Sequence, residues 1–232
     1  MSGGGKGMVV HSDLAQGSDE WLAARCGLLT ASEMKLIMTP TYKPSDNEKT
    51  RAHLYELLAQ RITGYVEPHY VGDDMLRGQA DELEARILYD QHYAPVQEVG
   101  FITNDQWGFT LGYSPDGLVG DDGLIECKSR RQKYQAQTIL GGVMPDEYLL
   151  QVQTGLLVTG RKWLDFVSYC GGLPMFTVRV YPDPDVQAAI IVAASAFEAK
   201  LATNLNEYRA EMERKALRLI PTERRIEQEM YL

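Results

Sequence analysis

Metal-binding cysteine pairs are missing from this sequence. Its 232 residues include three cysteines, Cys26, Cys127 and Cys170, and no two of them have a Cys-x-x-Cys spacing. That spacing is typical of structural zinc sites, and three thiols are one fewer than an iron–sulfur cluster usually takes. The sequence therefore argues against both kinds of centre. We expect three free thiols in a reducing cytosol.

Long hydrophobic runs are missing as well. Apolar stretches such as residues 188–194 are too short to span a bilayer. No basic segment followed by an apolar run of signal-peptide length lies near Met1. We therefore expect a cytoplasmic protein with no membrane partner. Because the chain begins with a Gly-rich stretch, we expect disorder over residues 1–10 and a single domain over residues 11–232.

The sequence also has no excess of basic residues. Lys and Arg number 23 against 32 Asp and Glu, which gives a net charge of −9 and a pI near 5.0. This balance argues against a large non-specific surface for nucleic acid. A metal-dependent nuclease is still compatible with it, because such an enzyme needs carboxylates and can confine its basic groups to one groove.

Helical and strand patterns alternate along the chain. Helices are predicted over residues 30–38, 48–63, 74–92, 132–140 and 146–159, and from 183 to about 217. Strands are predicted over residues 96–103, 107–113, 123–128, 163–169 and 176–181. This order predicts an α/β fold in which helices flank a central mixed β-sheet, followed by a long C-terminal helical segment.

The most informative residues are the turn Pro115-Asp116-Gly117 and the strand that carries Glu126 and Lys128. On a strand, Glu126 and Lys128 share one face, and Cys127 points to the other. A hairpin can bring Asp116 beside Glu126. Two carboxylates at one sheet edge form a hard-oxygen site suited to Mg²⁺, and the lysine adds a positive charge beside it.

Hydrolysis of a phosphodiester explains these residue types. The reaction needs a water that is nucleophilic at neutral pH and stabilisation of charge on the attacking and leaving oxygens, and metal ions supply both. A lysine can orient the water, can deprotonate it if its own pKa is depressed, and can neutralise developing charge. Each piece alone is common on solvated surfaces, so the interpretation depends on their conjunction.

Because this turn is followed by this strand, the sequence resembles the PD-(D/E)xK nucleases. It resembles more closely the family of phage lambda exonuclease and the YqaJ-type viral recombinases. Asp116, Glu126 and Lys128 match the signature. Three further segments, residues 21–33, 77–82 and 148–153, resemble the family's Trp…Arg-x-Gly-x-x-Thr-Ala-Ser, Gly-x-x-x-Glu and Tyr-x-x-Gln-x-Gln segments in the family's order. The resemblance implies a restriction-endonuclease-like fold.

The resemblance also implies roles for the matched residues. Asp116 and Glu126 would be the main Mg²⁺ ligands, with the backbone carbonyl of Cys127 as a candidate third ligand. Glu82 would hold a second metal ion, and Mn²⁺ would be an acceptable substitute for Mg²⁺. Lys128 would act on the nucleophilic water, and Gln151 would hydrogen-bond near it.

The resemblance also implies that a separate group of residues binds the DNA end. The resemblance assigns Arg25 and Ser32, joined by Ser114, to the 5′-terminal phosphate of the digested strand. A guanidinium group suits a phosphate, and Ser32 lies near an expected helix start, where backbone N–H groups favour an anion.

The implied activity is a 5′→3′ exonuclease that digests one strand of duplex DNA from its ends to mononucleotides and leaves 3′ overhangs. The implied partners are DNA ends, two further copies of the chain in a ring-shaped homotrimer, and a phage-type single-strand annealing protein in a bacterial host. Two alternatives remain: an endonuclease of the restriction or repair type, and an inactive nuclease fold that serves as a DNA-binding scaffold. The presence of the whole catalytic set argues against the scaffold.

Overall fold

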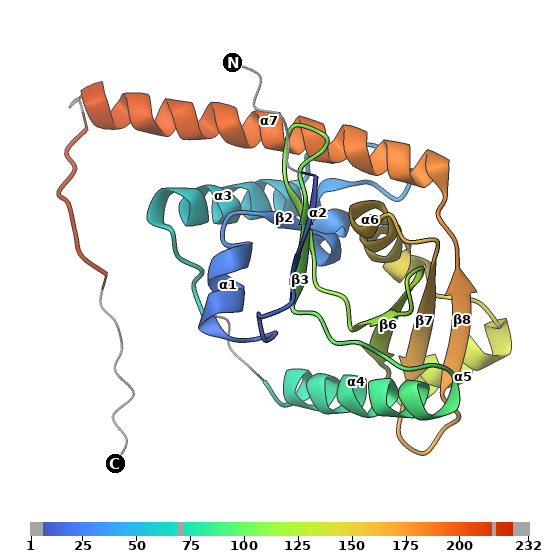
Figure 1. The fold of residues 1–232 in the computed structure, drawn as a ribbon. Helices are drawn as coiled ribbons and strands as arrows, with labels where there is room; N and C mark the ends of the chain where they lie inside the picture. The colour runs from blue at the N-terminus through green and yellow to red at the C-terminus, as the bar shows by residue number, and fades with distance from the viewer. Residues whose placement is uncertain (1–6, 69–71, 215–216, 225–232) are drawn as a thin grey trace, which may run out of the picture.

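The computed structural model describes residues 7–68, 72–214 and 217–224 and contains two mixed, four-stranded sheets among its helices (Figure 1). The strands are β1 (Met8–His11), β2 (Leu29–Thr30), β3 (Phe101–Asn104), β4 (Leu111–Tyr113), β5 (Gly117–Val119), β6 (Gly123–Ser129), β7 (Trp163–Tyr169) and β8 (Phe176–Val180). The helices are α1 (Asp19–Arg25), α2 (Met34–Ile37), α3 (Glu48–Thr63), α4 (Asp73–His92), α5 (Gln132–Gly141), α6 (Leu149–Thr159) and α7 (Pro184–Arg214), with 3₁₀ turns η1 (Ala31–Glu33) and η2 (Asp146–Tyr148).

The two sheets have the strand orders β1-β3-β4-β2 and β5-β6-β7-β8. In the second sheet β6 is antiparallel to β5 and parallel to β7, and β8 is antiparallel to β7. The chain passes from the first sheet to the second through the three residues between β4 and β5, which end at Asp116. This short link places a carboxylate where the two sheets meet.

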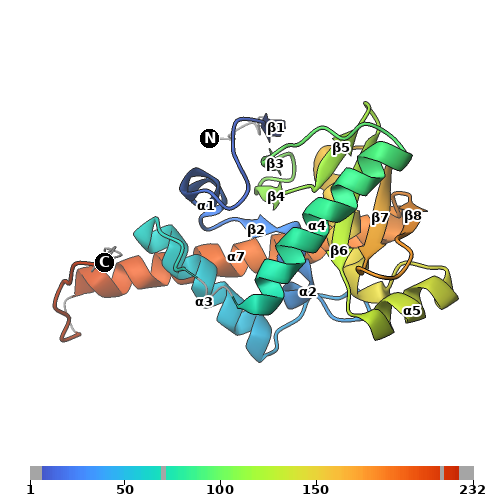
Figure 2. The ribbon, with the colours of Figure 1, turned by 90° about the horizontal axis from the view of Figure 1, so that it is seen from below.

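Strand β6 is buried on both faces, which explains its apolar sequence. Its residue Leu124 belongs to the main core with residues of α6 and α7. Ile125 and Cys127 point to the other face and pack with Ala85 and Tyr89 of α4. Figures 1 and 2 show α7 and α4 on opposite sides of the molecule with β6 and β7 between them. The alternation predicted for this strand is confirmed.

Helix boundaries follow the capping residues in the sequence. The side chain of Asn47 accepts a hydrogen bond from Thr50 N at the start of α3, and Gly64 closes that helix in the left-handed conformation. Gly160 closes α6 in the same way. At α7, Asp183 Oδ1 accepts hydrogen bonds from the next backbone N–H groups, and Pro184 takes the first helical position.

Several sequence-based expectations need correction. The disorder expected over residues 1–10 does not extend to Met8–His11, which pair antiparallel with β3; residues 1–6 lie outside the described part. Strand β5 lies where the sequence indicated only a turn, and residues 96–100 form one isolated bridge rather than a strand. Helix α7 ends at Arg214, and residues 215–216 are not described. The expected central sheet is divided into two, because residues 114–116 interrupt the strand pairing.

Helix α7 is also long and apolar enough, by length and composition, to cross a membrane, with a mean hydropathy of 1.3 over its most apolar window. Polar and charged residues interrupt its apolar positions, so an uninterrupted apolar run such as residues 188–194 does not reveal it. Three residues of that helix, Ile190, Ala194 and Phe197, are buried in the main core, where α7 packs against α3 and α6. A place in the core therefore accounts for part of its apolar character.

Candidate active site

Asp116 and Glu126 meet because of the register of the β5–β6 hairpin. Gly117, the first residue of β5, pairs with Ile125, so Asp116 lies opposite Glu126 just before β5 begins. Asp116 Oδ2 accepts a hydrogen bond of 2.6 Å from the backbone N–H of Cys127. The hairpin therefore brings the first carboxylate beside the second, as the sequence predicted.

Glu126 is a buried carboxylate with three side-chain donors. It is 2% exposed, and its Oε1 accepts from Lys128 Nζ at 2.6 Å and from Gln151 Nε2 at 2.5 Å. Its Oε2 accepts from the hydroxyl of Tyr113 at 2.7 Å. Three predicted site residues, Glu126, Lys128 and Gln151, are thus in direct contact.

Tyr113 is a site residue that the sequence analysis missed. It lies at the end of β4, and its ring packs against Gly155 of α6, where a Cβ atom would lie 2.7 Å from the tyrosine Cζ. Burial, with Glu126 and Asp116 nearby, raises the pKa of Tyr113 well above its usual value, so the phenol stays protonated and donates to Glu126. Nothing in the local sequence distinguishes it from the other 12 tyrosines.

Glu82 lies on α4 at the edge of this group. Ser129 Oγ donates to Asp81 Oδ2 and so joins α4 to the end of β6. Burial raises the pKa of Glu82, Lys128 lowers it, and Glu126 raises it again, which places all three groups within electrostatic reach of one another. The structure therefore gathers Glu82, Asp116 and Glu126 around Lys128.

Three acidic side chains, those of Glu82, Asp116 and Glu126, act on the single positive charge of Lys128. Burial and the Glu126 carboxylate raise the pKa of Asp116 to about 8, although Lys128 opposes the shift. Burial acts to lower the pKa of Lys128, but the carboxylates of Glu126, Asp116 and Glu82 outweigh it and the net shift is upward. The condition under which Lys128 would be a base, a depressed pKa, is therefore not met by the protein groups alone. Lys128 is a cation here.

The donor set suits a hard divalent cation. Three carboxylates and the Cys127 carbonyl offer only oxygen ligands, as Mg²⁺ prefers, and the raised pKa of Asp116 indicates that the group has too little positive charge. Within the described ranges, no three His, Cys, Asp or Glu side chains are already arranged as a ligand set. The oxygens of Glu126 are instead occupied by the Lys128, Gln151 and Tyr113 donors.

This electrostatic imbalance has a measurable consequence for stability. Folded Asp116 keeps its proton up to about pH 8, whereas an unfolded aspartate releases it near pH ~4. The folded state therefore binds more protons between these values, and its free energy of unfolding falls as pH rises through that window. In thermal unfolding with EDTA from about pH 5 to about pH 9, Asp116→Asn should lose this slope. If stability depended on pH in the same way for the two proteins, the neighbours of Asp116 would not raise its pKa.

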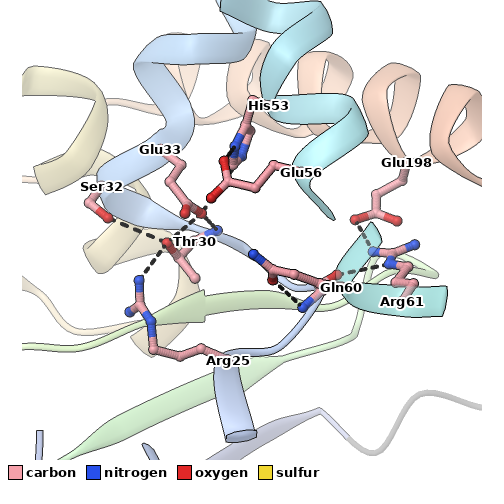
Figure 3. A network of polar contacts seen from close by, with 10 residues as sticks. Arg25, Thr30, Ser32, Glu33, His53, Glu56, Gln60, Arg61 and Glu198 are labelled. Carbon is pink, nitrogen blue, oxygen red and sulfur yellow. Dashed lines mark hydrogen bonds and ion pairs between the residues drawn. The ribbon is translucent and has the colours of Figure 1, made fainter. Parts of the chain in front are cut away.

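A second cluster brings together the three residues assigned to the phosphate. Arg25 Nη1 donates to Ser114 Oγ and Nη2 donates to Thr30 Oγ1, each at 3.2 Å. Thr30 Oγ1 lies 3.4 Å from Ser32 Oγ (Figure 3). The guanidinium group of Arg25 stacks on the Trp21 ring at 4.3 Å. Arg25, Ser32 and Ser114 thus share one site, although they come from three separate segments.

Neighbouring residues fix this second cluster. Glu33 closes a capping box on Thr30, accepting from its N–H at 3.0 Å and from its hydroxyl at 2.7 Å. The Trp21 Nε1–H donates to Ser114 Oγ at 3.0 Å. Burial lowers the pKa of Arg25, and Glu33 opposes that shift. Since Ser114 precedes Asp116 by two residues, the Arg25 cluster lies next to the carboxylate group along the chain.

Comparisons with known proteins find a family model and solved structures that are similar to this chain. A family model described as the YqaJ-like viral recombinase domain matches residues 20–162. The crystal structure of an alkaline exonuclease, LHK-Exo from Laribacter hongkongensis, has 36% sequence identity and a TM-score of 0.76 over 86% of this chain and 100% of that chain. The structure of LHK-Exo in complex with dAMP has the same identity and coverage and a TM-score of 0.77.

A more distant solved structure is similar to this chain in its fold alone. A phage-related exonuclease from Haemophilus somnus 129PT has 14% identity and a TM-score of 0.55, over 80% of this chain and 96% of that chain. No curated protein matches the chain significantly. The family assignment therefore depends on the family model and on the similarity to LHK-Exo.

Proposed function

Because the chain belongs to the YqaJ-like viral recombinase family, we propose that it is a Mg²⁺-dependent exonuclease. It degrades one strand of duplex DNA from the 5′ end, releases mononucleotides and leaves 3′ overhangs for recombination by strand annealing. The observation that carries this proposal is the contact of buried Glu126 with Lys128 and Gln151, beside Asp116. The similarity to an alkaline exonuclease supports it.

The residues divide the chemistry among them. Asp116, Glu126, Glu82 and the Cys127 carbonyl would hold the metal, which when bound supplies an activated water and charge stabilisation. Lys128, kept protonated by its carboxylate neighbours, neutralises charge that develops on the phosphate. Gln151 and Tyr113 hold the Glu126 carboxylate in one orientation.

The Arg25 cluster supplies strand polarity in this proposal. A guanidinium group and two or three hydroxyls form a receptor for a terminal phosphate, and Ser114 joins that receptor to the loop of Asp116. Among the residues that the structure describes, no carboxylate forms an ion pair with Arg25. Its charge is therefore available to an anion.

An end-labelled linear duplex tests direction and end recognition together. With Mg²⁺ we expect early release of a 5′ label as mononucleotide, retention of a 3′ label, and no cutting of closed circular DNA. Removing the 5′-phosphate should slow digestion by about tenfold, the value of one or two charge-assisted hydrogen bonds. Arg25→Ala should erase that difference, and Arg209→Ala, an exposed arginine on α7, should keep it.

Each alternative has its own signature in this assay. Equal digestion of 5′-hydroxyl and 5′-phosphate ends by the unaltered protein would remove Arg25 and Ser32 from end recognition. Cutting of closed circles would favour an endonuclease. Tight DNA binding with no hydrolysis at any end would favour an inactive scaffold.

We propose a ring-shaped homotrimer that encloses DNA in the cytoplasm of a bacterial host and delivers its overhang to a single-strand annealing protein. A ring reconciles the net charge of −9 with a DNA substrate, because an acidic outer surface and a phosphate-binding channel can coexist. Sedimentation of the purified chain measures the copy number.

A further inference from the structure

Gly27 lies in the turn that joins two parts of the Arg25 cluster. Arg25 ends α1 and Thr30 ends β2, so this turn sets the place of the guanidinium group relative to the hydroxyls of Thr30 and Ser32. Gly27 has a φ of +71°, in the left-handed region that favours glycine. A Cβ atom on it would lie 2.6 Å from Cγ of Arg61. The turn is therefore shaped around a side chain of α3.

Two consecutive residues of α3 bind both backbone polar groups of Gly27. Gln60 Oε1 accepts a hydrogen bond of 2.8 Å from Gly27 N, and Arg61 Nε donates at 2.8 Å to Gly27 O. Gly27 is buried, so a group that lost its partner would not regain one from water without cost. The two hydrogen bonds therefore restrain the backbone two residues after Arg25.

Arg61 is itself held by the long helix α7. Its Nη2 donates to Oε1 of Glu198 at 2.8 Å, and the two side chains are 25% and 12% exposed (Figure 3). The charge of Arg61 is thus paired with a carboxylate rather than offered to a phosphate. What Arg61 contributes to the Arg25 cluster is a fixed position for the turn at Gly27.

We propose that Arg61 is a positioning residue for recognition of the DNA end and acts through Gly27 on Arg25. The proposal rests on the role proposed above for Arg25 at the 5′-terminal phosphate. Glu198 fixes Arg61, and Arg61 fixes the Gly27 carbonyl. The turn then keeps the guanidinium group of Arg25 within hydrogen-bonding distance of Thr30. Helix α7 thereby contributes to selection of the DNA end from outside the Arg25 cluster.

Binding of short duplexes to the full chain in Ca²⁺, without turnover, tests this inference. We expect the unaltered chain to bind a 5′-phosphorylated end about tenfold more tightly than a 5′-hydroxyl end. Arg61→Met keeps the aliphatic part of the side chain but loses both hydrogen bonds. It should reduce this preference to about threefold and leave affinity for the 5′-hydroxyl end unchanged. Arg51→Met, at an exposed position of the same helix, should keep the full preference.

Two variants of Glu198 separate the effect of position from that of charge. Glu198→Gln keeps an oxygen that accepts from Arg61 and should keep the preference. Glu198→Ala releases Arg61 and should lower the preference to about threefold. If Arg61 acted by its charge instead, both variants would free that charge and raise affinity for the phosphorylated end. Loss of folded protein would weaken binding to both ends equally and leave their ratio unchanged.

Equal preferences in Arg61→Met and Arg51→Met, or in the two Glu198 variants, would overturn the inference and leave end recognition by Arg25 in place. No preference in the unaltered chain would overturn both. Arg25→Ala, measured beside these variants, should remove the whole preference whether or not Arg61 acts on it. Hydrolysis is measured separately, so a chain that shows the expected preferences but cuts no DNA keeps the positioning role of Arg61 and loses the nuclease function.

Discussion

Lys128→Ala should lower kcat for DNA hydrolysis by about 10³-fold while the affinity for a DNA end stays nearly unchanged. The ammonium group lies 2.6 Å from Glu126 on a side chain that is 19% exposed, and the substitution removes it. The charge that develops on the phosphate then has one stabilising partner fewer. Single-turnover rates with end-labelled duplex measure the chemical step, and a filter-binding titration in Ca²⁺ measures affinity.

The matched control is Lys133→Ala, which removes an exposed lysine from α5. It should leave both the rate and the affinity unchanged. If Lys128→Ala and Lys133→Ala behaved alike, or if Lys128→Ala weakened DNA binding as much as it slowed hydrolysis, Lys128 would serve binding rather than the reaction.

Glu126→Gln should abolish both hydrolysis and stabilisation of the protein by Mg²⁺. Saturating metal raises the melting temperature of a protein that binds it only in the folded state, and we expect this rise for the unaltered chain. The substitution keeps the shape of the side chain but removes a ligand charge at a position that is 2% exposed. Because Lys128 also loses its ion-pair partner, the variant should melt at a lower temperature without metal.

Its control is Glu84→Gln, an exposed glutamate on α4. This variant should melt like the unaltered chain and respond to Mg²⁺ in the same way. A Glu126→Gln protein that still gained stability from Mg²⁺ and still cut DNA would place the metal elsewhere.

Much of the fold could be predicted because its signals are local. Asn47 and Gly64 delimit α3, and Asp183 with Pro184 starts α7, since each cap satisfies backbone groups within one turn. The fold class, a mixed α/β arrangement with helices flanking the sheets, is confirmed by the similarity to LHK-Exo. Strand β1 could not be predicted, because its hydrogen bonds come from the distant strand β3, and β5 was missed because it has only three residues and begins within a turn.

The site residues also divide into those with a local signal in the sequence and those without one. Asp116, Glu126 and Lys128 follow from spacing, since a hairpin and a strand fix their positions. Arg25 and Ser114 are 89 residues apart and could be joined only through the family resemblance, which the family model confirms. Tyr113 gave no local signal, because its role depends on Glu126 and on the space beside Gly155.

The most direct test of the account is the position of a bound metal. A crystal of the chain soaked in Mn²⁺ should show an anomalous peak within about 2.0–2.3 Å of oxygens from Asp116 and Glu126, with the ammonium group of Lys128 displaced from Glu126. A peak bound by other residues, or none at these two carboxylates in crystals of a chain that cuts DNA with Mn²⁺, would contradict it.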